Sequence, residues 1–320
     1  MFKGPRVEIY TSKQIINAFK PDLAAAMIRD GLIAYSAGKV QLAPAQHIKF
    51  DALEADCVIK SGYLEGDKVF TVKVSSGFYQ NPQQGLASNH GMLIVFSART
   101  GVPQALLLDK GWLTAQRTAM TGRLVAEAMA PAEVEAIGIL GTGQQAHMQL
   151  EALGEVQPCR KVWVWGRHEA GLNAFCEHFR DMGYDMRPTQ DAQQLAAACR
   201  LIVTCTPSPH PLLQAEWIMP GTHITAVGAD RKGKQELSCN LVALADVRVA
   251  DSLSQSLEFG EFSHAFEAGL ISQADVAELG NVLAGKLQGR QSASDITIAD
   301  LTGLAIQDVQ IAKSVLAMAE

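Results

Sequence analysis

Residues 135–146 run Glu135-Ala136-Ile137-Gly138-Ile139-Leu140-Gly141-Thr142-Gly143-Gln144-Gln145-Ala146, a short apolar strand followed by two glycines and the start of a helical pattern. In a dinucleotide-binding turn of this form, the first glycine permits the tight bend and the second lets the backbone approach a pyrophosphate. A small third residue, here Ala146, allows the helix to pack on the strand. Because the N-terminus of such a helix presents free N–H groups to phosphate, the stretch predicts a nucleotide cofactor bound at Gly141 and Gly143.

From residue 135 onward the chain alternates between strand and helix patterns. Such alternation is typical of a parallel sheet wound with helices on both faces. We therefore predict an α/β fold with a Rossmann-type doubly wound parallel sheet. Its strands are expected at residues 136–140, 161–165, 201–204, 223–227 and 247–250.

In the residues before this region, apolar and polar side chains alternate with the period of a strand. Alternating segments at 55–63 and 68–75 flank Glu65-Gly66-Asp67, and segments at 92–98 and 104–108 flank a second turn, which predicts two hairpins. A short strand at 7–10 and two helices are expected before them, and a helix at 114–130 after them. We predict a second, α+β domain with an antiparallel sheet. The closing segment, 295–320, has the pattern of a strand, a turn and a helix that could return to this domain.

The bulk composition is that of an ordinary soluble globular protein with enough length, 320 residues, for two domains. The net charge of -6, without a cluster of basic residues, argues against nucleic-acid or anionic-membrane partners, so a small-molecule partner is expected. The six cysteines stand singly and are expected to be reduced core thiols. No apolar run reaches the roughly 18 to 20 residues that span a bilayer, and the N-terminus lacks a signal-peptide pattern, so we expect a cytoplasmic protein.

The end of the second expected strand bears on the choice of cofactor. An acid there would bind the ribose 2′-hydroxyl of NAD, but the strand ends in Gly166-Arg167-His168. Because the planar guanidinium of an arginine pairs with phosphate oxygens, Arg167, with His168 beside it, favours NADP. A solvated Arg167 beside an NAD that is held by other residues remains open. Thr206 and Gly228 follow later strands at the edge where ligands bind, and Gly228 would let a nicotinamide approach the backbone.

Three charged residues are candidates for the chemistry. Lys73 lies in a strand with apolar neighbours, Arg117 lies near the start of a largely apolar helix, and Asp230 follows the fifth strand of the parallel sheet. Together they suit a substrate with one carboxylate and one carbon–nitrogen centre that gains or loses hydride. On pattern alone, Lys73 also fits a solvated strand lysine, Arg117 a surface arginine and Asp230 a turn aspartate. The sequence holds no nucleophile elbow or metal-ligand motif, so no metal is expected.

Several motifs follow one another in a fixed order along most of the chain, and with them the chain resembles the ornithine cyclodeaminase and mu-crystallin family. Beside the glycine turn at 141–146, they are Leu113 to Ala119, Val227 to Asp230 with Gln235 to Leu237, Gly260-Glu261, Leu279 to Lys286 with Gly289-Arg290, and Asp295 to Asp308.

The resemblance implies a homodimer that binds NAD(H) or NADP(H) and acts on amino or imino acids. Residues 1–116 with 297–320 would form the substrate-binding and dimerisation domain, and residues 117–296 the dinucleotide-binding domain. By similarity, Lys73 and Arg117 would hold the substrate carboxylate, and Asp230 would be the acid or base at the reacting nitrogen; Lys73 and Asp230 are thus the candidate catalytic residues. The positions that match cofactor contacts are Ser88, Asn89, Thr118, Gln144, Gln145, Arg167, Thr206, Val227 and Thr302.

The chain departs from the family pattern after the second helix. Many members carry an arginine there that also binds the carboxylate, whereas residues 40–49 contain none and His47 falls about where it would be. The departure argues against ornithine and against ligand binding of the mu-crystallin kind. The Pro-x-x-His arrangement at 44–47 and the segment 108–114 look more like the branch that contains iminosuccinate reductase and the ectoine-utilisation member. His47 could meet a second polar group on the substrate, although a loop histidine packed on the sheet fits equally well.

The leading hypothesis is therefore a reductase that delivers hydride from NAD(P)H to a small α-imino acid, such as iminosuccinate or a cyclic imine carboxylate. The reverse reaction would be that of an amino acid dehydrogenase. Two alternatives remain open. One is ornithine cyclodeaminase, which converts ornithine to proline and ammonia, and the other is a non-catalytic NADPH- and ligand-binding protein like mu-crystallin.

Overall fold

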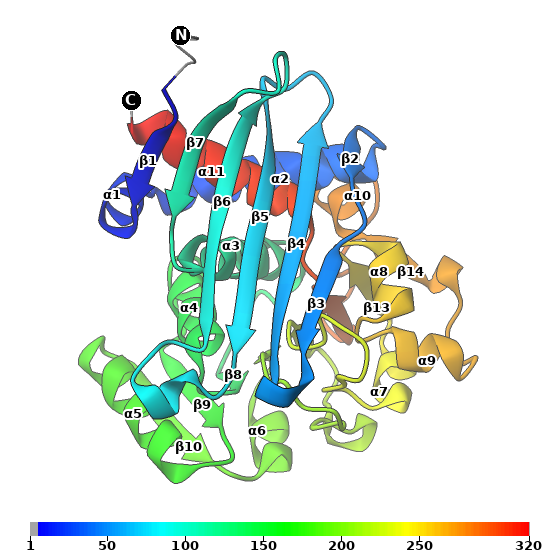
Figure 1. Ribbon diagram of the computed structural model, residues 1–320. Coiled ribbons are helices and arrows are strands. Elements are labelled where there is room, and N and C mark those ends of the chain that lie inside the picture. The colour runs from blue at the N-terminus through cyan, green and yellow to red at the C-terminus, as the bar shows by residue number, and fades with distance from the viewer. Residues whose placement is uncertain (1–5, 320) are drawn as a thin grey trace, which may run out of the picture. The chain divides into compact units, whose positions relative to one another are not determined.

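The computed structural model describes residues 6–319, which form two compact units (Figure 1). The first unit contains the described residues up to Arg117 together with those from Leu304 onward, and the second contains Thr118–Gly303. The first division falls within helix α3 (Trp112–Met129), and the second directly precedes helix α11 (Ala305–Ala319). Each unit has a sheet of its own.

The first unit is built on a seven-stranded sheet in the order β1-β7-β6-β5-β4-β2, with β3 paired to β4. The two predicted hairpins are present as β4–β5 and β6–β7. The sheet is mixed rather than antiparallel, because β1 pairs in parallel with β7. The strands are β1 (Glu8–Thr11), β2 (Val40–Leu42), β3 (Gln46–Phe50), β4 (Ala55–Leu64), β5 (Val69–Phe78), β6 (Asn89–Ser97) and β7 (Pro103–Leu108).

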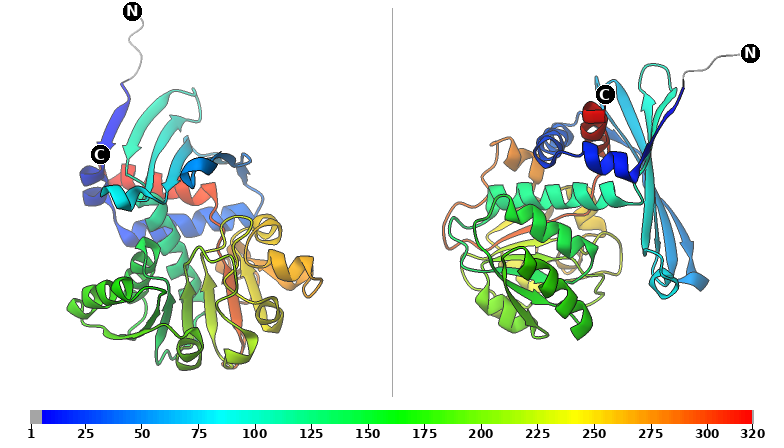
Figure 2. Two further views of the ribbon diagram at one scale, coloured as in Figure 1. Left: turned by 60° about the horizontal axis from the view of Figure 1, so that its bottom comes forward. Right: turned by 90° about the vertical axis from the view of Figure 1, so that its left-hand side faces the viewer.

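Helices α1 (Ser12–Ala18), α2 (Pro21–Ser36) and α11 belong to this unit and lie on one face of its sheet (Figure 2). Helix α11 packs on β4, β5 and β6 and also on α2. Two glycines permit the close approach: a Cβ at Gly62 would lie 3.3 Å from Ala305, and one at Gly31 would lie 2.8 Å from Gln310. Residues of β5 alternate accordingly, so that Lys73 is buried on the α11 face. On the other face, the rings of Phe70 and Phe96 stack at 4.9 Å.

The second unit is built on an eight-stranded sheet in the order β10-β9-β8-β11-β12-β15-β13-β14. All of its neighbouring strands are parallel, which confirms the predicted Rossmann-type fold. The strand order reverses between β8 and β11, where open α/β sheets bind ligands at the carboxyl ends of their strands. The strands are β8 (Ile137–Leu140), β9 (Lys161–Trp165), β10 (Asp185–Thr189), β11 (Leu201–Thr204), β12 (His223–Ala226), β13 (Val247–Ala250), β14 (Val276–Glu278) and β15 (Thr297–Asp300).

The helices of the second unit, beside the longer part of α3, connect these strands. Among the described helices of either unit, none combines the length and apolarity that crossing a membrane requires. The helices are α4 (Gln144–Gly154), α5 (Glu169–Asp181), α6 (Ala192–Ala198), α7 (Cys239–Leu244), α8 (Leu253–Glu258), α9 (Ser263–Glu267) and α10 (Leu279–Leu283). Short 3-10 turns lie at Asp51–Leu53, Asn81–Gln84, Ala215–Trp217 and Gln273–Asp275.

The C-terminal segment divides between the two units, contrary to the prediction that all of residues 297–320 belong to the first domain. Strand β15 is fully buried and pairs with β12 and β13 in the sheet of the second unit. Only residues from Leu304 onward cluster with the first unit. The division therefore lies after Gly303, because the backbone hydrogen bonds of β15 are made inside the parallel sheet.

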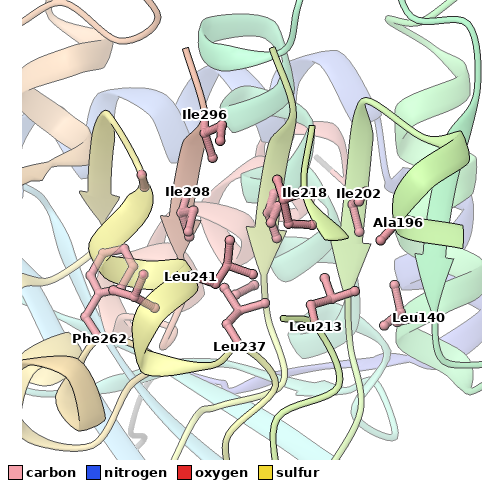
Figure 3. Packing of buried hydrophobic residues seen from close by; sticks show 14 of the residues in the cluster. Leu140, Ala196, Ile202, Leu213, Ile218, Leu237, Leu241, Phe262, Ile296 and Ile298 are labelled. Carbon is pink, nitrogen blue, oxygen red and sulfur yellow. The ribbon is translucent and has the colours of Figure 1, made fainter. Parts of the chain in front are cut away.

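The core of the second unit is a cluster of buried apolar side chains from its strands and the helices beside them (Figure 3). Ile202 from β11 and Ile298 from β15 contribute to this cluster with Leu241 from α7, and all three are fully buried. Each such side chain stabilises the fold by about 1.5–3 kcal/mol through the apolar surface that it removes from water.

The six cysteines are free thiols. The prediction that they are core thiols is right for Cys176 and Cys199, which are buried, but the other four are only half-buried: Cys57, Cys159, Cys205 and Cys239.

Substitution Ile306→Ala tests the packing of α11 on the first unit. Ile306 is fully buried, and its Cγ1 atom would lie 3.0 Å from a Cβ placed on Gly31. We expect the free energy of unfolding to fall by about 2–4 kcal/mol, because the truncation leaves a cavity between α2 and α11. Urea denaturation followed by circular dichroism would measure this. The matched control Ile16→Ala, on a residue that is 49% exposed, should cost clearly less, and equal costs would contradict the packing described.

Candidate functional site

A pocket lies at the carboxyl ends of β8, β9 and β11, where the strand order of the second unit reverses. It encloses about 750 Å³ of space that is open to solvent. Several predicted cofactor residues line it together. They are Gly141, Gly143, Arg167, His168 and Thr206, joined by Thr142, Trp165, Gly166, Cys205, Pro207, Ser208, Pro209 and Leu212.

The glycine turn has the geometry that the sequence predicts. Gly141 has a φ of +124°, and a Cβ there would lie 3.0 Å from the carbonyl oxygen of Cys205. Gly143 is the N-cap of α4. A Cβ at Gly143 would meet nothing within 4 Å, so the approach to the first turn of the helix is open.

The residues around this turn fit the phosphates of a dinucleotide. The first N–H groups of α4, an 11-residue helix, have no partner within the helix and carry its positive dipole end. The amide nitrogen of Gln145 is buried and has no hydrogen-bond partner among the described residues. A buried donor of this kind costs about 1–3 kcal/mol unless a ligand or water accepts from it. The turn, the helix end and Gln145 therefore suit an anionic ligand.

The residues after β9 line the part of the pocket that is expected to distinguish NAD from NADP. Gln190 fixes this segment, since its carbonyl accepts from Trp165 Nε1 at 3.0 Å and its amide donates to the carbonyl of Arg167 at 2.9 Å. The side chains of Arg167 and His168 are exposed, and His168 is the N-cap of α5. No acidic residue is among those that line the pocket.

One buried carboxylate, that of Glu236, organises the ends of β11 and β12. Its Oε1 accepts from the backbone N–H and the hydroxyl of Thr206, both at 2.7 Å. Its Oε2 accepts from the hydroxyl of Thr204 at 2.7 Å and from the N–H of Gly228 at 2.8 Å. Burial raises the pKa of Glu236, while these four donors oppose the shift. The donors of Thr206 are thus committed to Glu236, and Thr206 presents a fixed orientation to the pocket.

The same contacts give a structural reason for a glycine at position 228. A Cβ at Gly228 would lie 2.1 Å from the carbonyl oxygen of Thr206 and 2.5 Å from the carboxylate of Glu236. Glu236 and Thr206 therefore require the glycine, and its contact with a nicotinamide remains a prediction. A second buried acid, Glu261, supports the arrangement by accepting from the N–H groups of Glu236 and Leu237.

Other predicted cofactor residues of the second unit have structural partners. Thr302 donates its N–H and its hydroxyl to Asp251 Oδ1, at 3.0 and 2.8 Å. The carbonyl of Thr118 accepts from Gln149 Nε2 at 3.2 Å. Val227 directly follows β12 and is buried, and Gln144 opens α4 with an exposed side chain. Their contacts with a cofactor remain predictions.

In the first unit, Lys73 and Arg117 are brought together by Asp308. Lys73 Nζ lies 2.9 Å from Asp308 Oδ2, and Arg117 Nε lies 3.3 Å from Asp308 Oδ1. Arg117 Nη1 also donates to Gln307 Oε1 at 2.7 Å. Lys73 is 2% exposed, Arg117 8% and Asp308 1%. The alternatives of a solvated strand lysine and a surface arginine are therefore wrong.

The electrostatics of this cluster place the titration of Lys73 close to neutrality. Burial, opposed by Asp308 and assisted by the charges of Arg117 and Lys60, lowers the pKa of Lys73 to about 8. Lys73 and Arg117 together hold the pKa of Asp308 below its usual value despite its burial. Two cations against one carboxylate leave the cluster with a surplus positive charge.

The remaining predicted residues lie outside these two groups. His47 is exposed on β3, which rules out the packed loop histidine, and Asn89 is exposed at the start of β6, directly after Ser88. Asp230 is exposed in the loop after β12, and its Oδ1 accepts from Lys234 Nζ at 2.6 Å. Asp230 and the dinucleotide pocket belong to the second unit, and Lys73, Arg117 and His47 to the first.

Sequence reasoning missed Asp308 and Glu236, although the sequence carries a signal for Asp308. Asp308 is the one acid of α11, which is rich in apolar residues, and both Asp308 and the adjacent Gln307 are about 1% exposed. A carboxylate in such a helix indicates a buried cationic partner. Glu236 lies next to Leu237, at the start of a helix pattern, but its four donors come from residues up to 32 positions away. Local pattern carries no trace of such contacts.

Comparison with known proteins extends over nearly the whole chain. The family model for the ornithine cyclodeaminase/mu-crystallin family matches residues 8–320. A protein of Sinorhizobium fredii named as an uncharacterized cyclodeaminase, y4tK, is 38% identical over 312 residues, which cover 96% of this chain and 94% of that protein.

Two solved structures share the fold and a substantial part of the sequence. An archaeal alanine dehydrogenase dimer with bound NAD superposes with a TM-score of 0.90 at 33% identity, covering 98% of this chain and 96% of that one. The iminosuccinate reductase of Paracoccus denitrificans in complex with NAD+ gives a TM-score of 0.88 at 30% identity, with 98% and 97% covered.

Substitution Glu236→Gln tests the role of this carboxylate in shaping the pocket. A glutamine has one acceptor oxygen, so the N–H of Thr206 or of Gly228 would face an NH₂ group, at a cost of about 1–3 kcal/mol. We expect a lower midpoint of thermal unfolding and weaker NADH binding in a fluorescence titration. The control Glu258→Gln, at the exposed end of α8, should change neither. Unaltered NADH affinity in Glu236→Gln would show that the pocket does not depend on Glu236.

Proposed function

The chain belongs to the ornithine cyclodeaminase/mu-crystallin family, as its ordered motifs predict, and we propose that it is an NAD(P)H-dependent imine reductase acting on a small α-imino acid. In the reverse direction it would be an amino acid dehydrogenase. The observation that carries the proposal is the buried cluster of Lys73, Arg117 and Asp308, whose surplus positive charge suits a substrate carboxylate. The relatives with solved structures are a dehydrogenase and a reductase, which supports the same class of reaction.

The proposed cofactor is a nicotinamide dinucleotide held by the second unit. The open N-cap at Gly143, the end of α4 and Gln145 would receive its phosphates. The bound cofactor supplies or accepts the hydride. Both solved relatives carry NAD, whereas Arg167 and the lack of an acid in the pocket favour NADP, so we propose that this chain accepts NADPH.

The proposed role of Lys73 and Arg117 is to bind the substrate carboxylate. Their side chains are preorganised because Asp308 and Gln307 hold them before any ligand arrives. Lys73 must be protonated to bind an anion, and a pKa near 8 makes this step depend on pH. A carboxylate that enters the cluster would balance its surplus charge.

The proposed role of Asp230 is to supply the proton at the reacting nitrogen, directly or through a water. Its side chain is exposed, and the ammonium of Lys234 lies 2.6 Å from its Oδ1. A carboxylate is a common general acid or base in enzymes.

We also propose a homodimer. The solved alanine dehydrogenase relative is a dimer. In this chain, the face of the first sheet that carries the Phe70–Phe96 stack is not covered by a helix of the first unit among the described residues, and a second copy would remove it from water (Figure 2).

A cyclodeaminase is the second candidate, favoured by the name of the Sinorhizobium relative. It would release ammonia from ornithine without net change in nicotinamide absorbance, whereas the reductase consumes NAD(P)H. A panel of α-keto acids with ammonia, cyclic imine carboxylates and ornithine, each with NADH and NADPH, separates the two.

The pH dependence of kcat/KM tests the assignment of Lys73. We expect kcat/KM to fall as the pH rises through about 8, because the ammonium of Lys73 then loses its proton. Lys73→Met should lower kcat/KM by about 10- to 100-fold, the loss expected for a hydrogen bond to a charged group. Lys73→Arg should move the falling limb to higher pH, since a guanidinium stays protonated. Stopped spectrophotometric assays at 340 nm would measure these changes.

Lys13→Met, on an exposed lysine, is the control for Lys73→Met. Asp230→Asn is a second test variant. Asp230→Asn should reduce kcat more than it raises KM, because it removes the proton donor and leaves the carboxylate site in place. Wild-type rates in both Lys73→Met and Asp230→Asn would refute the residue assignment.

Substitution Arg167→Ala tests the cofactor proposal. Loss of a guanidinium that pairs with a 2′-phosphate should raise the KM for NADPH by about tenfold or more and leave that for NADH nearly unchanged. Arg187→Ala, on an exposed arginine of β10 that pairs with Asp185, is the matched control. An equal effect of Arg167→Ala on both cofactors would argue against a role in NADP binding.

A further inference from the structure

A third cation lies on the same face of the first sheet as Lys73. In the ladder between β4 and β5, Lys60 is directly opposite Lys73. Residues that are directly opposite in an antiparallel pair point to the same face, with Cβ atoms about 5 Å apart. Lys60 therefore belongs to the face on which α11 contributes Asp308.

The pairing of Lys60 with Lys73 places two cationic side chains directly opposite each other. Like charges that are directly opposite in a ladder destabilise a sheet. Lys60 acts on the cluster electrostatically, since its charge lowers the pKa of both Lys73 and Asp308. Asp308 is already shared by Lys73 and Arg117. Asp109, a buried acid whose pKa is raised by burial and lowered by the charge of Lys73, accepts the N–H of Leu113.

The position of Lys60 differs from that of Lys73 in its access to solvent. Lys73 is buried, whereas Lys60 is half-buried. Further along the same face, Val58 is opposite both Ser75 and His47. His47 is exposed, so the basic side chains run from the buried Lys73 through Lys60 towards solvent.

We infer that Lys60 is a specificity-determining residue that binds a second anionic group on the substrate, so that the preferred substrate is an α-imino dicarboxylate. Lys73 and Arg117 would hold the α-carboxylate, and Lys60 the distal one. Adjacent strands lie about 4.8 Å apart, which suits two carboxylates of one small molecule. A substrate with a cationic side chain, such as ornithine, would place its ammonium against Lys60. The inference rests on the proposed function for the reaction, but binding of the distal anion can be measured without turnover.

The kinetic experiment compares two imines that differ by one carboxylate. Oxaloacetate with ammonia and pyruvate with ammonia are assayed with NADH and NADPH, and the ratio of their kcat/KM values is the readout. We expect the wild type to prefer the dicarboxylate and Lys60→Met to lower the ratio by about tenfold or more, the loss expected for a hydrogen bond to a charged group. Lys60→Arg should retain the preference. Lys68→Met, in the turn between β4 and β5, is the control and should not change the ratio.

The binding experiment uses succinate and propionate, which lack a reacting nitrogen, as probes of the protein with NADH. Isothermal titration should show tighter binding of succinate to the wild type and loss of this difference in Lys60→Met. Wild-type protein that does not distinguish the probes, or a ratio that Lys60→Met leaves unchanged, would overturn the inference. Succinate binding that depends on Lys60 without turnover of any imine would support the anion site and refute only the proposed function.

Discussion

The first unit depends on one buried carboxylate that no neighbour in sequence explains. Asp308 arrives on the last helix of the chain and meets Lys73 from the middle of a sheet and Arg117 from the start of α3. A charge buried without a partner costs several kcal/mol, so removal of any one of the three side chains would leave an uncompensated charge. The ion pairs orient two cations whose combined charge exceeds that of Asp308, which leaves a site that is rigid and still attractive to an anion.

The second unit also contains buried carboxylates, but these accept hydrogen bonds from hydroxyl and backbone N–H groups instead of pairing with cations. Glu236 receives four hydrogen bonds from Thr204, Thr206 and Gly228, and Glu261 in turn receives the N–H of Glu236. Burial raises the pKa of both Glu236 and Glu261. The pKa of Glu261 is raised well above its usual value, because the negative charge of Glu236 adds to the effect of burial. The N–H groups of Thr206, Gly228 and Glu236 each have a carboxylate acceptor within the protein. The strand ends are therefore held in position independently of a ligand.

The sequence predicts the parts of this protein that local pattern controls. Five of the eight strands of the parallel sheet, β8, β9, β11, β12 and β13, are apolar runs bounded by turn residues, and the glycine turn at Gly141 has a conformation that other residues rarely adopt. Strands β2, β3, β10 and β14 escape prediction. Strands β2 and β14 have only three residues each, β3 is exposed along its length, and the edge strand β10 contains Pro188.

The site is predictable only in its residue types. Lys73, Arg117 and Asp230 stand out as charges at unexpected positions, but the burial of Lys73 and Arg117 depends on Asp308, which is distant in sequence from both. Gly228 illustrates the limit well. The need for a glycine can be recognised from its place at a strand end, whereas the atoms that require it, on Glu236 and Thr206, belong to the tertiary structure.

The C-terminal segment contributes to both units, and this affects how the chain folds during synthesis. Strand β15 occupies an interior position between β12 and β13, and α11 covers the sheet of the first unit and delivers Asp308. During synthesis from the N-terminus, therefore, the parallel sheet stays incomplete until β15 has emerged, and the first sheet, whose strands end at Leu108, stays uncovered on one face until α11 follows. Until then the nascent chain exposes a gap between β12 and β13 and the face of the first sheet that carries Lys73, so residues 297–319 complete the packing of both units.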